Sequence, residues 1–352
     1  MTTVDASGLD QQGKIKCVVW DLDETVWEGT LLTTPGTPRV RDHVVDVMRT
    51  LDARGILQSV ASRNDPDVAW PVLAGAGIAE LYLHPQIGWG AKSASVARIA
   101  QALNIGLESI AFVDDQAFEL AEVSAEYPSV TCILADALEA AIETPAFNPR
   151  FITDESRRRR QLYLSADRRD CEEENFEGPS AEFMASLGLT MRIEPASHDD
   201  LRRAEELTVR TNQLNSTGIT HSFEELVALA GSSDHLVLVA SIEDRFGSYG
   251  KIGLAVVGTS SDDWTLMLLI VSCRVVSRGV GTILLNDVMR RAKKVGVGLV
   301  ADFVDTGRNR MMFVTYAFAG FTEEARDDGR VLLRCSLDSI QDVPSYVELV
   351  SR

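Results

Sequence analysis

The fold of the first half of this chain is decided by one segment, VVWDLDET, at residues Val18–Thr25. Its apolar start is typical of a buried parallel strand, and that strand ends in two acids, Asp21 and Asp23. Residues two apart on an extended chain point to the same side, so both acids can reach one site beyond the strand's carboxyl end, where open α/β sheets bind ligands. Two carboxylates this close indicate a hard divalent cation such as Mg²⁺. A lone pair of acids more often caps a helix or lies in a solvated turn, so this interpretation needs support from other residues of the same half.

Further polar residues stand at strand ends and at one helix start in the same half. They are Ser62 and Arg63 after the strand predicted over 56–61, Lys92 at the start of an amphipathic helix, and Asp114 and Asp115 after the strand predicted over 109–113. A serine at a strand end is usually a turn former, and many lysines simply face solvent. A lysine beside a helix N-terminus is nevertheless unfavourable unless an anion shares the site, because that end of the helix dipole is positive. The order of these groups on consecutive α/β units therefore favours one common site.

This order, Asp-x-Asp-x-Thr, then Ser, Lys and Asp-Asp, resembles the four motifs of the haloacid dehalogenase (HAD) phosphotransferases. The resemblance implies that Asp21 attacks phosphorus and forms an aspartyl-phosphate, while Asp23 acts first as general acid and then as general base. It also implies two residue sets: a Mg²⁺ site of Asp21, Asp23 (through its carbonyl), Asp114 and Asp115, and phosphate-binding residues Thr25, Ser62, Arg63 and Lys92. The gaps between the motifs have no room for a cap domain, so we expect an open site suited to a bulky or protein-borne substrate.

Length and charge limit the possible functions. The chain has 352 residues, enough for two domains, and a net charge of −18 from 34 basic and 52 acidic residues. This charge argues against partners such as nucleic acid or an anionic membrane. The five cysteines are widely spaced and Met1–Gln12 is polar rather than a secretory leader, so we expect reduced thiols in the cytoplasm. The longest apolar run, around residues 264–273, is about half the length of a membrane span.

Changes in composition divide the chain into three parts. We predict a HAD-like α/β domain over residues 1–150, with a Rossmannoid parallel sheet and no cap domain. Pro145 and Pro149 mark its edge, and the charged stretch 151–187 predicts a solvated helical linker. Recurring apolar strands over 188–352, together with a glycine-rich turn, predict a GNAT-like α+β domain.

This glycine-rich turn lies between a strand and an amphipathic helix. Backbone N–H groups of such a turn can bind a pyrophosphate, and the arrangement resembles the acyl-CoA loop of the GNAT acyltransferases. Gly279 and Gly281 fit the signature of that loop, but Val276 stands where glutamine or arginine is expected. A glycine pair alone is more often a tight turn than a cofactor loop, and Val276 argues against ordinary acetyl-CoA binding.

Cys273 stands at the end of the strand that enters this turn. A cysteine there is usually a small buried apolar residue. Here Arg274 and Arg278 are close in sequence and a helix N-terminus comes next, and such surroundings favour a nucleophilic thiolate. The sequence does not determine a general base for this thiol; His221 and Asp302 are candidates.

Nearly all of the chain after Lys14 resembles the FkbH-like glyceryl transferase/phosphatases of polyketide biosynthesis, which join a HAD domain to a GNAT-like domain. The landmarks outside the HAD motifs are RTNQLNSTG at 210–218, GKIG at 250–253, SCRV at 272–275 and GF at 320–321. The resemblance marks one set of residues as a site for substrate and pantetheine: Arg210, Asn212, Gln213, Asn215, Arg274, Arg278, Gly279 and Gly281. The residue types of RTNQ indicate only a helix end that runs into a polar loop. Glu24, Val26 and Glu28 replace the commoner Asn, Leu and Gly of the family's first motif, and the acids of that motif are intact.

The resemblance implies a Mg²⁺-dependent enzyme with two activities. Cys273 would take the phosphoglyceryl group of D-1,3-bisphosphoglycerate, a small acyl phosphate, as a thioester. The HAD site would remove the 3-phosphate, and glycerate would pass to the phosphopantetheine thiol of an acyl carrier protein.

Two other functions fit parts of the same pattern. One is a small-molecule HAD phosphatase fused to an acyl-CoA-dependent N-acetyltransferase, which tight binding of acetyl-CoA would favour. The other is a non-catalytic scaffold that docks carrier proteins, and the intact Asp21, Asp23 and Lys92 argue against it.

Overall fold

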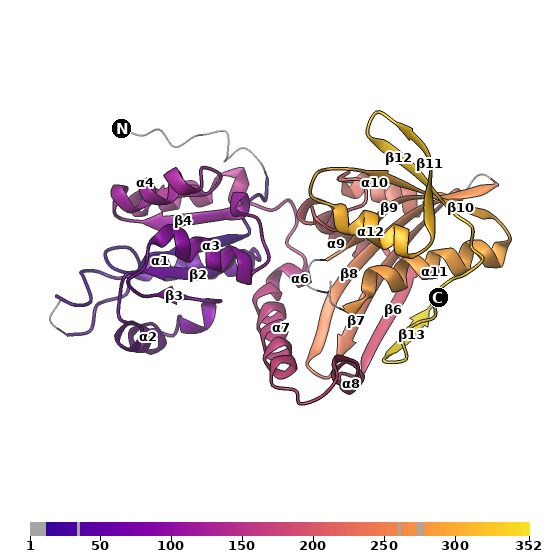
Figure 1. The fold of residues 1–352 in the computed structure, drawn as a ribbon. Coiled ribbons are helices and arrows are strands. Elements are labelled where there is room, and N and C mark those ends of the chain that lie inside the picture. Colours follow the sequence, from indigo (N-terminus) through magenta and orange to yellow (C-terminus); the bar gives the residue numbers. More distant parts are fainter. Residues whose placement is uncertain (1–11, 34–35, 260–261, 273–274, 276–277) are drawn as a thin grey trace. The chain divides into compact units, whose positions relative to one another are not determined.

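The structure is a computed structural model that describes residues 12–33, 36–259, 262–272, 275 and 278–352. The chain divides into two compact units, one ending at Leu164 and the other beginning at Ser165. This division falls inside helix α7 (Arg159–Glu174). In Figure 1 each unit is a sheet with helices packed on it.

The first unit is built on a five-stranded parallel sheet in the order β3-β2-β1-β4-β5. Its strands are β1 (Cys17–Trp20), β2 (Leu57–Ser62), β3 (Gln86–Ile87), β4 (Ile110–Asp114) and β5 (Thr131–Leu134). β1 is the central strand and is buried over its whole length, which explains its unbroken apolar run. The strand order reverses beside β1, and this is where open parallel sheets bind ligands.

Helices cover both faces of this sheet. They are α1 (Asp42–Ala53), α2 (Pro66–Gly75), α3 (Lys92–Ala102), α4 (Ala117–Glu126) and α5 (Leu138–Ile142). Alternate β1 residues point to opposite faces, so Val18 and Trp20 join the core with α1, α2 and α5, and Cys17 and Val19 join the core with α3 and α4. Within the described ranges a loop links β1 to α1, and between β2 and β3 there are only α2 and one 3₁₀ turn. The predicted α/β fold, with a parallel sheet and no cap domain, is confirmed for the described residues.

The stretch 151–187, predicted as a helical linker, is divided between the two units. It contains α6 (Asp154–Arg157), α7 and α8 (Ser180–Ser186). Near its start, Arg160 pairs with Asp52 at 3.0 Å in the first unit. Further along, Arg169 pairs with Asp244 at 2.7 Å in the second unit, and α8 contributes to the core of that unit.

The second unit contains an eight-stranded mixed sheet in the order β11-β12-β10-β9-β8-β7-β6-β13. Its strands are β6 (Leu189–Pro195), β7 (His235–Asp244), β8 (Gly247–Gly258), β9 (Asp263–Val271), β10 (Gly298–Val304), β11 (Phe321–Asp327), β12 (Arg330–Cys335) and β13 (Val347–Ser351). The pairs β9–β10 and β6–β13 are parallel, and the other pairs are antiparallel. Helices again lie on both faces: α9 (His198–Arg210) and α10 (Phe223–Ala230) share one core, and α11 (Val280–Val295) and α12 (Arg310–Phe318) share the other. This is the α+β unit expected for the second half.

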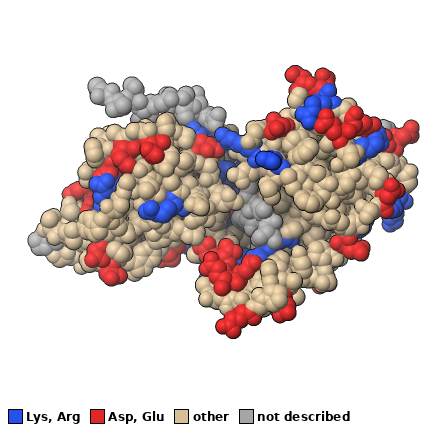
Figure 2. Space-filling model, in the orientation of Figure 1, with Lys and Arg blue, Asp and Glu red and all other residues tan. Residues whose placement is uncertain are grey.

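The surface is rich in acidic side chains. In Figure 2 they gather over α7 and over the hairpin of β11 and β12. The exposed acids there include Glu172, Glu174, Glu323 and Glu324. None of the described helices has the length and apolar character needed to cross a membrane.

Candidate active site

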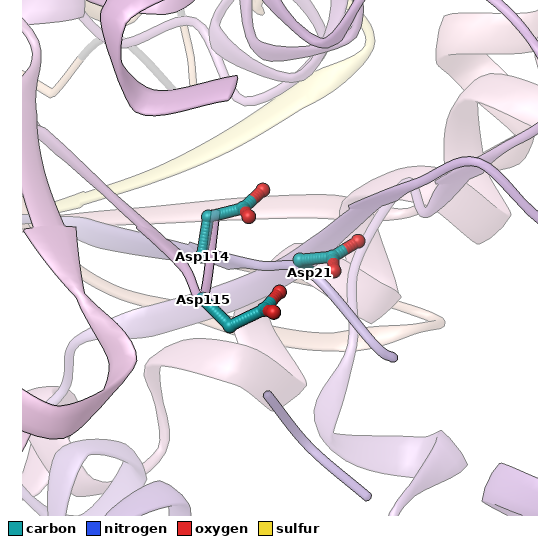
Figure 3. A group of neighbouring side chains, drawn as sticks. All are labelled: Asp21, Asp114 and Asp115. Atoms are coloured by element: carbon teal, nitrogen blue, oxygen red, sulfur yellow. The ribbon is translucent and has the colours of Figure 1, made fainter. Parts of the chain in front are cut away.

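The pairing of β1 with β4 brings three predicted acids together. The two strands run parallel with Trp20 opposite Val113, and the Asp21 N–H donates to the Val113 carbonyl at 2.9 Å. Asp21 and the pair Asp114 and Asp115 therefore lie at the ends of neighbouring strands, at the same sheet edge. One carboxylate oxygen from each of the three lies within 4.8 Å of the others. Figure 3 shows the three carboxylates pointing to the same side of the strand ends.

Lys92 provides the cation of this group. It is the first residue of α3, and its Nζ lies 2.8 Å from Asp21 Oδ1 and 2.5 Å from Asp114 Oδ2. Its side chain is only 4% exposed. Two buried carboxylates thus hold the lysine at the positive end of a helix, and they are the anions that the unfavourable dipole position requires.

The electrostatics of the site show an excess of negative charge. Burial raises the pKa of Asp21 and of Asp114 although Lys92 lies beside both. Burial and the charge of Asp21 raise the pKa of Asp115. Burial disfavours the charged ammonium of Lys92, but its two carboxylate partners raise its pKa above the usual value. One ammonium does not balance three carboxylates, so a divalent cation bound by their oxygens would relieve the repulsion.

Several polar atoms around these strand ends have no hydrogen-bond partner among the described residues. They are Thr25 Oγ1, Asn64 Oδ1, Asp115 Oδ1 and Glu119 Oε2, all buried. A buried polar atom without a partner costs about 1–3 kcal/mol, so a ligand that bonded several of these atoms would remove that cost. The carboxylate set and the unpaired oxygens fit a hard cation with oxygen ligands together with a phosphoryl group.

The other predicted phosphate-binding residues border the same site. Ser62 is 3% exposed, hydrogen-bonds to Asp21 and accepts a hydrogen bond from Asn64 Nδ2 at 3.1 Å. Arg63 is partly exposed and pairs with the buried Glu119 at 3.0 Å. Asn64 was not predicted from the sequence; its position directly after Ser62 and Arg63 is the signal that could have indicated it.

Asp23 is placed differently from the three clustered acids. Its carboxylate is half-buried, and Oδ1 accepts hydrogen bonds from Trp27 Nε1 at 2.8 Å and from the Leu31 N–H at 3.0 Å. Its side chain is not part of the three-acid cluster. The acid–base role of its side chain and the contact of its carbonyl with the metal stay predictions.

The residues predicted in the second unit are only partly described. Cys273 and Arg274 lie outside the described residues, as does Val276. Arg278 is 3% exposed, and its Nη1 donates to Glu173 Oε2 at 3.0 Å. This pairing gives Arg278 a structural contact with α7, and its predicted contact with pantetheine stays a prediction.

The two predicted glycines mark the start of α11. Gly279 precedes the helix with φ +69°, a conformation that favours glycine. Gly281 faces β9, since a Cβ there would lie 3.4 Å from Val271 Cγ2. The local backbone and packing therefore explain why glycine occupies both positions, and the predicted binding of a phosphate at this turn stays a prediction.

The structure gives a physical meaning to RTNQLNSTG. β9 and β10 are paired only as far as Leu266 and Ala301, and the chain at 214–216 then runs along the edge of β9. Ser216 bonds Leu269 through both its N–H and its Oγ, and its carbonyl accepts from the Val304 N–H at 3.0 Å. The segment therefore fills the space where two parallel strands separate.

The predicted side chains of this segment have different surroundings. Asn212 and Gln213 are exposed, and Arg210 lies 4.0 Å from Glu206. Asn215 is 1% exposed, and its Oδ1 accepts from two N–H groups of its own loop, at 3.1 and 2.9 Å. Asn215 thus shapes the loop, and the predicted contacts of the exposed Asn212 and Gln213 stay predictions.

Asn309 holds this segment in place and was also not predicted. Its Nδ2 donates to the carbonyls of Asn215 at 2.9 Å and Val304 at 2.8 Å. It is fully buried at the start of α12. A buried asparagine just before a helix is the only sequence signal, and it does not identify the Asn215 carbonyl, which is 94 residues away.

The candidate bases for Cys273 already have partners. Asp302 is bound by Arg330 through both oxygens, at 3.1 and 2.6 Å, and His221 Nδ1 lies 3.7 Å from Glu225. A role for either as a base stays a prediction.

Solved structures of two kinds are similar to this chain. The N-terminal part of the protein BF1531 from Bacteroides fragilis, containing a phosphatase domain complexed with Mg, is 26% identical over 37% of this chain and 38% of its own, with a TM-score of 0.32. The ribosomal-protein-S18-alanine N-acetyltransferase from Escherichia coli is 17% identical over 41% of this chain and 92% of its own, with a TM-score of 0.34. The PaiA N-acetyltransferase from Thermoplasma acidophilum, in complex with coenzyme A, is 20% identical over 41% and 98%, with a TM-score of 0.34.

The two protein classes expected from the sequence are thus both among the structural neighbours. The match to the phosphatase protein spans well under two thirds of its length, at 38%. No family model and no curated protein matches this chain. TM-scores of this size do not support a functional conclusion, which therefore depends on the geometry of the site.

Proposed function

We propose that the first unit is a Mg²⁺-dependent phosphatase that works through an aspartyl-phosphate. The observation that carries this proposal is the cluster of Asp21, Asp114 and Asp115 around one buried lysine, at the carboxyl ends of two parallel strands. Mg²⁺ bound there would neutralise phosphoryl charge.

The residues of the chain have separate roles in this reaction. An oxygen of Asp21 attacks phosphorus, and the bond from phosphorus to the leaving oxygen breaks as Asp23 gives that oxygen a proton. Asp23 then takes a proton from water, which attacks the same phosphorus and releases inorganic phosphate and the Asp21 carboxylate. Lys92 and Ser62 stabilise the phosphoryl oxygens throughout.

Hydrolysis of p-nitrophenyl phosphate tests this proposal. We expect activity with Mg²⁺, loss of activity with EDTA, and a fall of at least about 10³-fold in Asp21→Asn, because the nucleophile is removed. The variant Asp46→Asn, altered on the exposed side of α1, is the control and should keep full activity. Activity that is independent of metal, or that survives in Asp21→Asn, contradicts the proposal.

We infer further that the whole chain loads a glyceryl unit onto an acyl carrier protein. The support is the resemblance of SCRV, RTNQLNSTG and the HAD motifs to the FkbH-like enzymes. The Cys273 thiolate attacks the acyl carbon of D-1,3-bisphosphoglycerate. A thioester forms between the sulfur and the phosphoglyceryl group, and inorganic phosphate leaves. After removal of the 3-phosphate, the pantetheine thiol of the carrier displaces the Cys273 thiolate. The free state of the four described cysteines suits an enzyme of the reducing cytoplasm.

Intact mass measures this transfer directly. With D-1,3-bisphosphoglycerate, wild type should gain one phosphoglyceryl or glyceryl group, and Cys273→Ala should gain none. Cys171→Ala, which removes an exposed cysteine, is the matched control and should still be labelled. Asp21→Asn should carry the group with its phosphate still attached. An adduct on Cys273→Ala, or none on wild type, contradicts the thioester.

The alternative is a phosphatase fused to an acyl-CoA-dependent N-acetyltransferase. The sequence argues against it, because Val276 stands where the acyl-CoA loop of such enzymes carries glutamine or arginine. We therefore expect no tight binding of acetyl-CoA by calorimetry; a Kd near or below about 1 μM would favour the alternative.

A further inference from the structure

Two N–H donors converge on a single oxygen of Asp23. Trp27 Nε1 and the backbone N–H of Leu31 both donate to Oδ1, at 2.8 and 3.0 Å. The other oxygen, Oδ2, has no partner among the residues that the structure describes. The two oxygens of this carboxylate are therefore not equivalent.

The donor on Trp27 is held firmly. The indole is fully buried in the core beneath α1 and α2, and the backbone of Trp27 forms an antiparallel bridge with Val40. The backbone N–H of Trp27 also donates to the Leu22 carbonyl at 3.2 Å. A side chain fixed in this way can orient the carboxylate that it contacts.

The chemistry of a carboxyl group turns this asymmetry into a division of roles. An oxygen that accepts two N–H donors has both of its lone-pair directions in use, so it is a poor place for a proton. A proton on Asp23 is then carried by Oδ2. General acid–base catalysis requires the proton to be on the oxygen that faces the leaving group, and hydrogen bonds to Oδ1 favour Oδ2 as the oxygen that carries it.

We propose that Trp27 is a positioning residue that, with the Leu31 N–H, fixes Oδ2 of Asp23 as the proton-carrying oxygen of the phosphatase. This inference depends on the proposed phosphatase activity and goes beyond it, because it assigns a role to a buried aromatic residue outside the acids, lysine and hydroxyls. Proton donation to the leaving oxygen matters most when the leaving group is a poor one. The role of Trp27 therefore predicts a dependence on the leaving group.

Trp20 offers a matched control in the same core. It is also fully buried, and its Nε1 donates to Gln58 Oε1 at 3.2 Å, away from the acids. Replacing either tryptophan by phenylalanine removes one indole N–H and a similar volume from one hydrophobic core. A defect of packing alone should therefore affect both variants in the same way.

The experiment compares kcat/KM for p-nitrophenyl phosphate and for phenyl phosphate, whose leaving group is poorer, in wild type, Trp27→Phe and Trp20→Phe with Mg²⁺. We expect Trp27→Phe to lose about 10-fold more activity on phenyl phosphate than on p-nitrophenyl phosphate. Trp20→Phe should lose the same factor on both. Equal losses on the two substrates in Trp27→Phe overturn the inference, whereas an inactive wild type overturns the proposed phosphatase itself.

A second variant keeps the test decisive if Trp27→Phe does not fold. β-(3-Benzothienyl)alanine at position 27 keeps the shape of the indole and replaces its N–H by sulfur. We expect this protein to melt near the wild-type temperature and to show the same selective loss on phenyl phosphate. An unchanged ratio of the two activities would show that the indole N–H has no role in proton transfer.

Discussion

Each unit contains a buried ion pair, and the two pairs differ in a way that separates structure from function. In the second unit, Arg169 and Asp244 carry one charge each, and both oxygens of Asp244 are fully used. They accept from Arg169 at 2.7 and 3.0 Å, from the Phe246 N–H at 2.8 Å and from the Tyr249 hydroxyl at 2.8 Å. The guanidinium also lies 3.7 Å from the centre of the Tyr249 ring.

The group around Lys92 contains the same kinds of residue but is not balanced. Lys92 faces Asp21 and Asp114, with Asp115 beside them, and polar atoms nearby have no partner within the described ranges. A balanced and fully bonded pair needs nothing further, so it fixes α7 to the sheet. A bound cation would relieve an excess of buried acid with unpaired oxygens, so the difference between the two ion pairs supports the proposed function of the first unit's site.

The largest expected effect is the loss of phosphatase activity when Lys92 is replaced. Lys92→Met removes the only cation paired with Asp21 and Asp114 among the described residues, so we expect phosphatase kcat/KM to fall by about 10²–10³-fold. Arg98→Met, on the same helix but bonded to Gln86, should change activity by less than about 2-fold. Steady-state kinetics with Mg²⁺ measures both, and a fully active Lys92→Met would remove the distinction between the two ion pairs.

The corresponding change in the second unit should affect stability. Arg169→Met leaves the Asp244 carboxylate buried without its cation, and we expect a loss of about 3–5 kcal/mol in the free energy of unfolding. The double variant Arg169→Met/Asp244→Leu should recover part of this loss, because no buried charge is left unpaired, although the Phe246 N–H and the Tyr249 hydroxyl lose their acceptor. Urea denaturation measures both. A loss below about 1 kcal/mol in the single variant would mean that the pair contributes little.

A smaller loss of stability is expected when Asn309 is replaced. This residue bonds the segment at 214–216, which fills the space where β9 and β10 separate. Asn309→Ala leaves the buried carbonyls of Asn215 and Val304 without this donor, so we expect a loss of about 2 kcal/mol. Asn175→Ala, which removes an exposed asparagine bonded to the Cys171 carbonyl, is the control and should change stability by less than about 0.5 kcal/mol. Equal losses in the free energy of unfolding in the two variants would show that the buried hydrogen bonds of Asn309 contribute no more to stability than the exposed bond of Asn175.

The smallest expected effect sharpens the charge imbalance itself. Without metal, Asp115→Asn should raise Tm by about 1–2 °C, because it removes one of three repelling carboxylates at a position partly open to solvent. With Mg²⁺, wild type should gain more in Tm than the variant, because the variant has lost a ligand.

The difference in Tm between Asp115→Asn and wild type, measured without metal, should depend on pH. A carboxyl whose pKa is raised in the folded state binds its proton more tightly there, so folding is favoured at low pH and this contribution is lost as pH rises. The advantage of Asp115→Asn measured without metal should therefore shrink as pH falls from about 7 toward about 4, because the wild-type carboxyl takes up its proton in the folded state before it does so in the unfolded state. A constant or growing difference would contradict the raised pKa of Asp115.

Much of the first unit could be predicted from the sequence. The apolar runs end at Asp21, Ser62 and Asp114, and parallel strands place their carboxyl ends at one edge, so the grouping of these residues results from local pattern and strand direction. The two oxygens of Asp23 could not be distinguished in this way. Their difference depends on Trp27 and Leu31, whose contacts with Asp23 arise only when the loop closes on the core.

In the first unit, the sequence by itself determined most of the order of strands and helices and the placement of Asp21, Lys92 and Asp114 at one end of the sheet, because alternation, helix ends and strand ends are local properties. Only the tertiary structure decided that Arg278 pairs with Glu173, that residues 214–216 fill the gap between β9 and β10, and that Arg169 is neutralised by Asp244. Each of these contacts joins residues far apart in the chain. Their formation depends on how packed elements bring unpaired polar groups together, and no local pattern encodes that outcome.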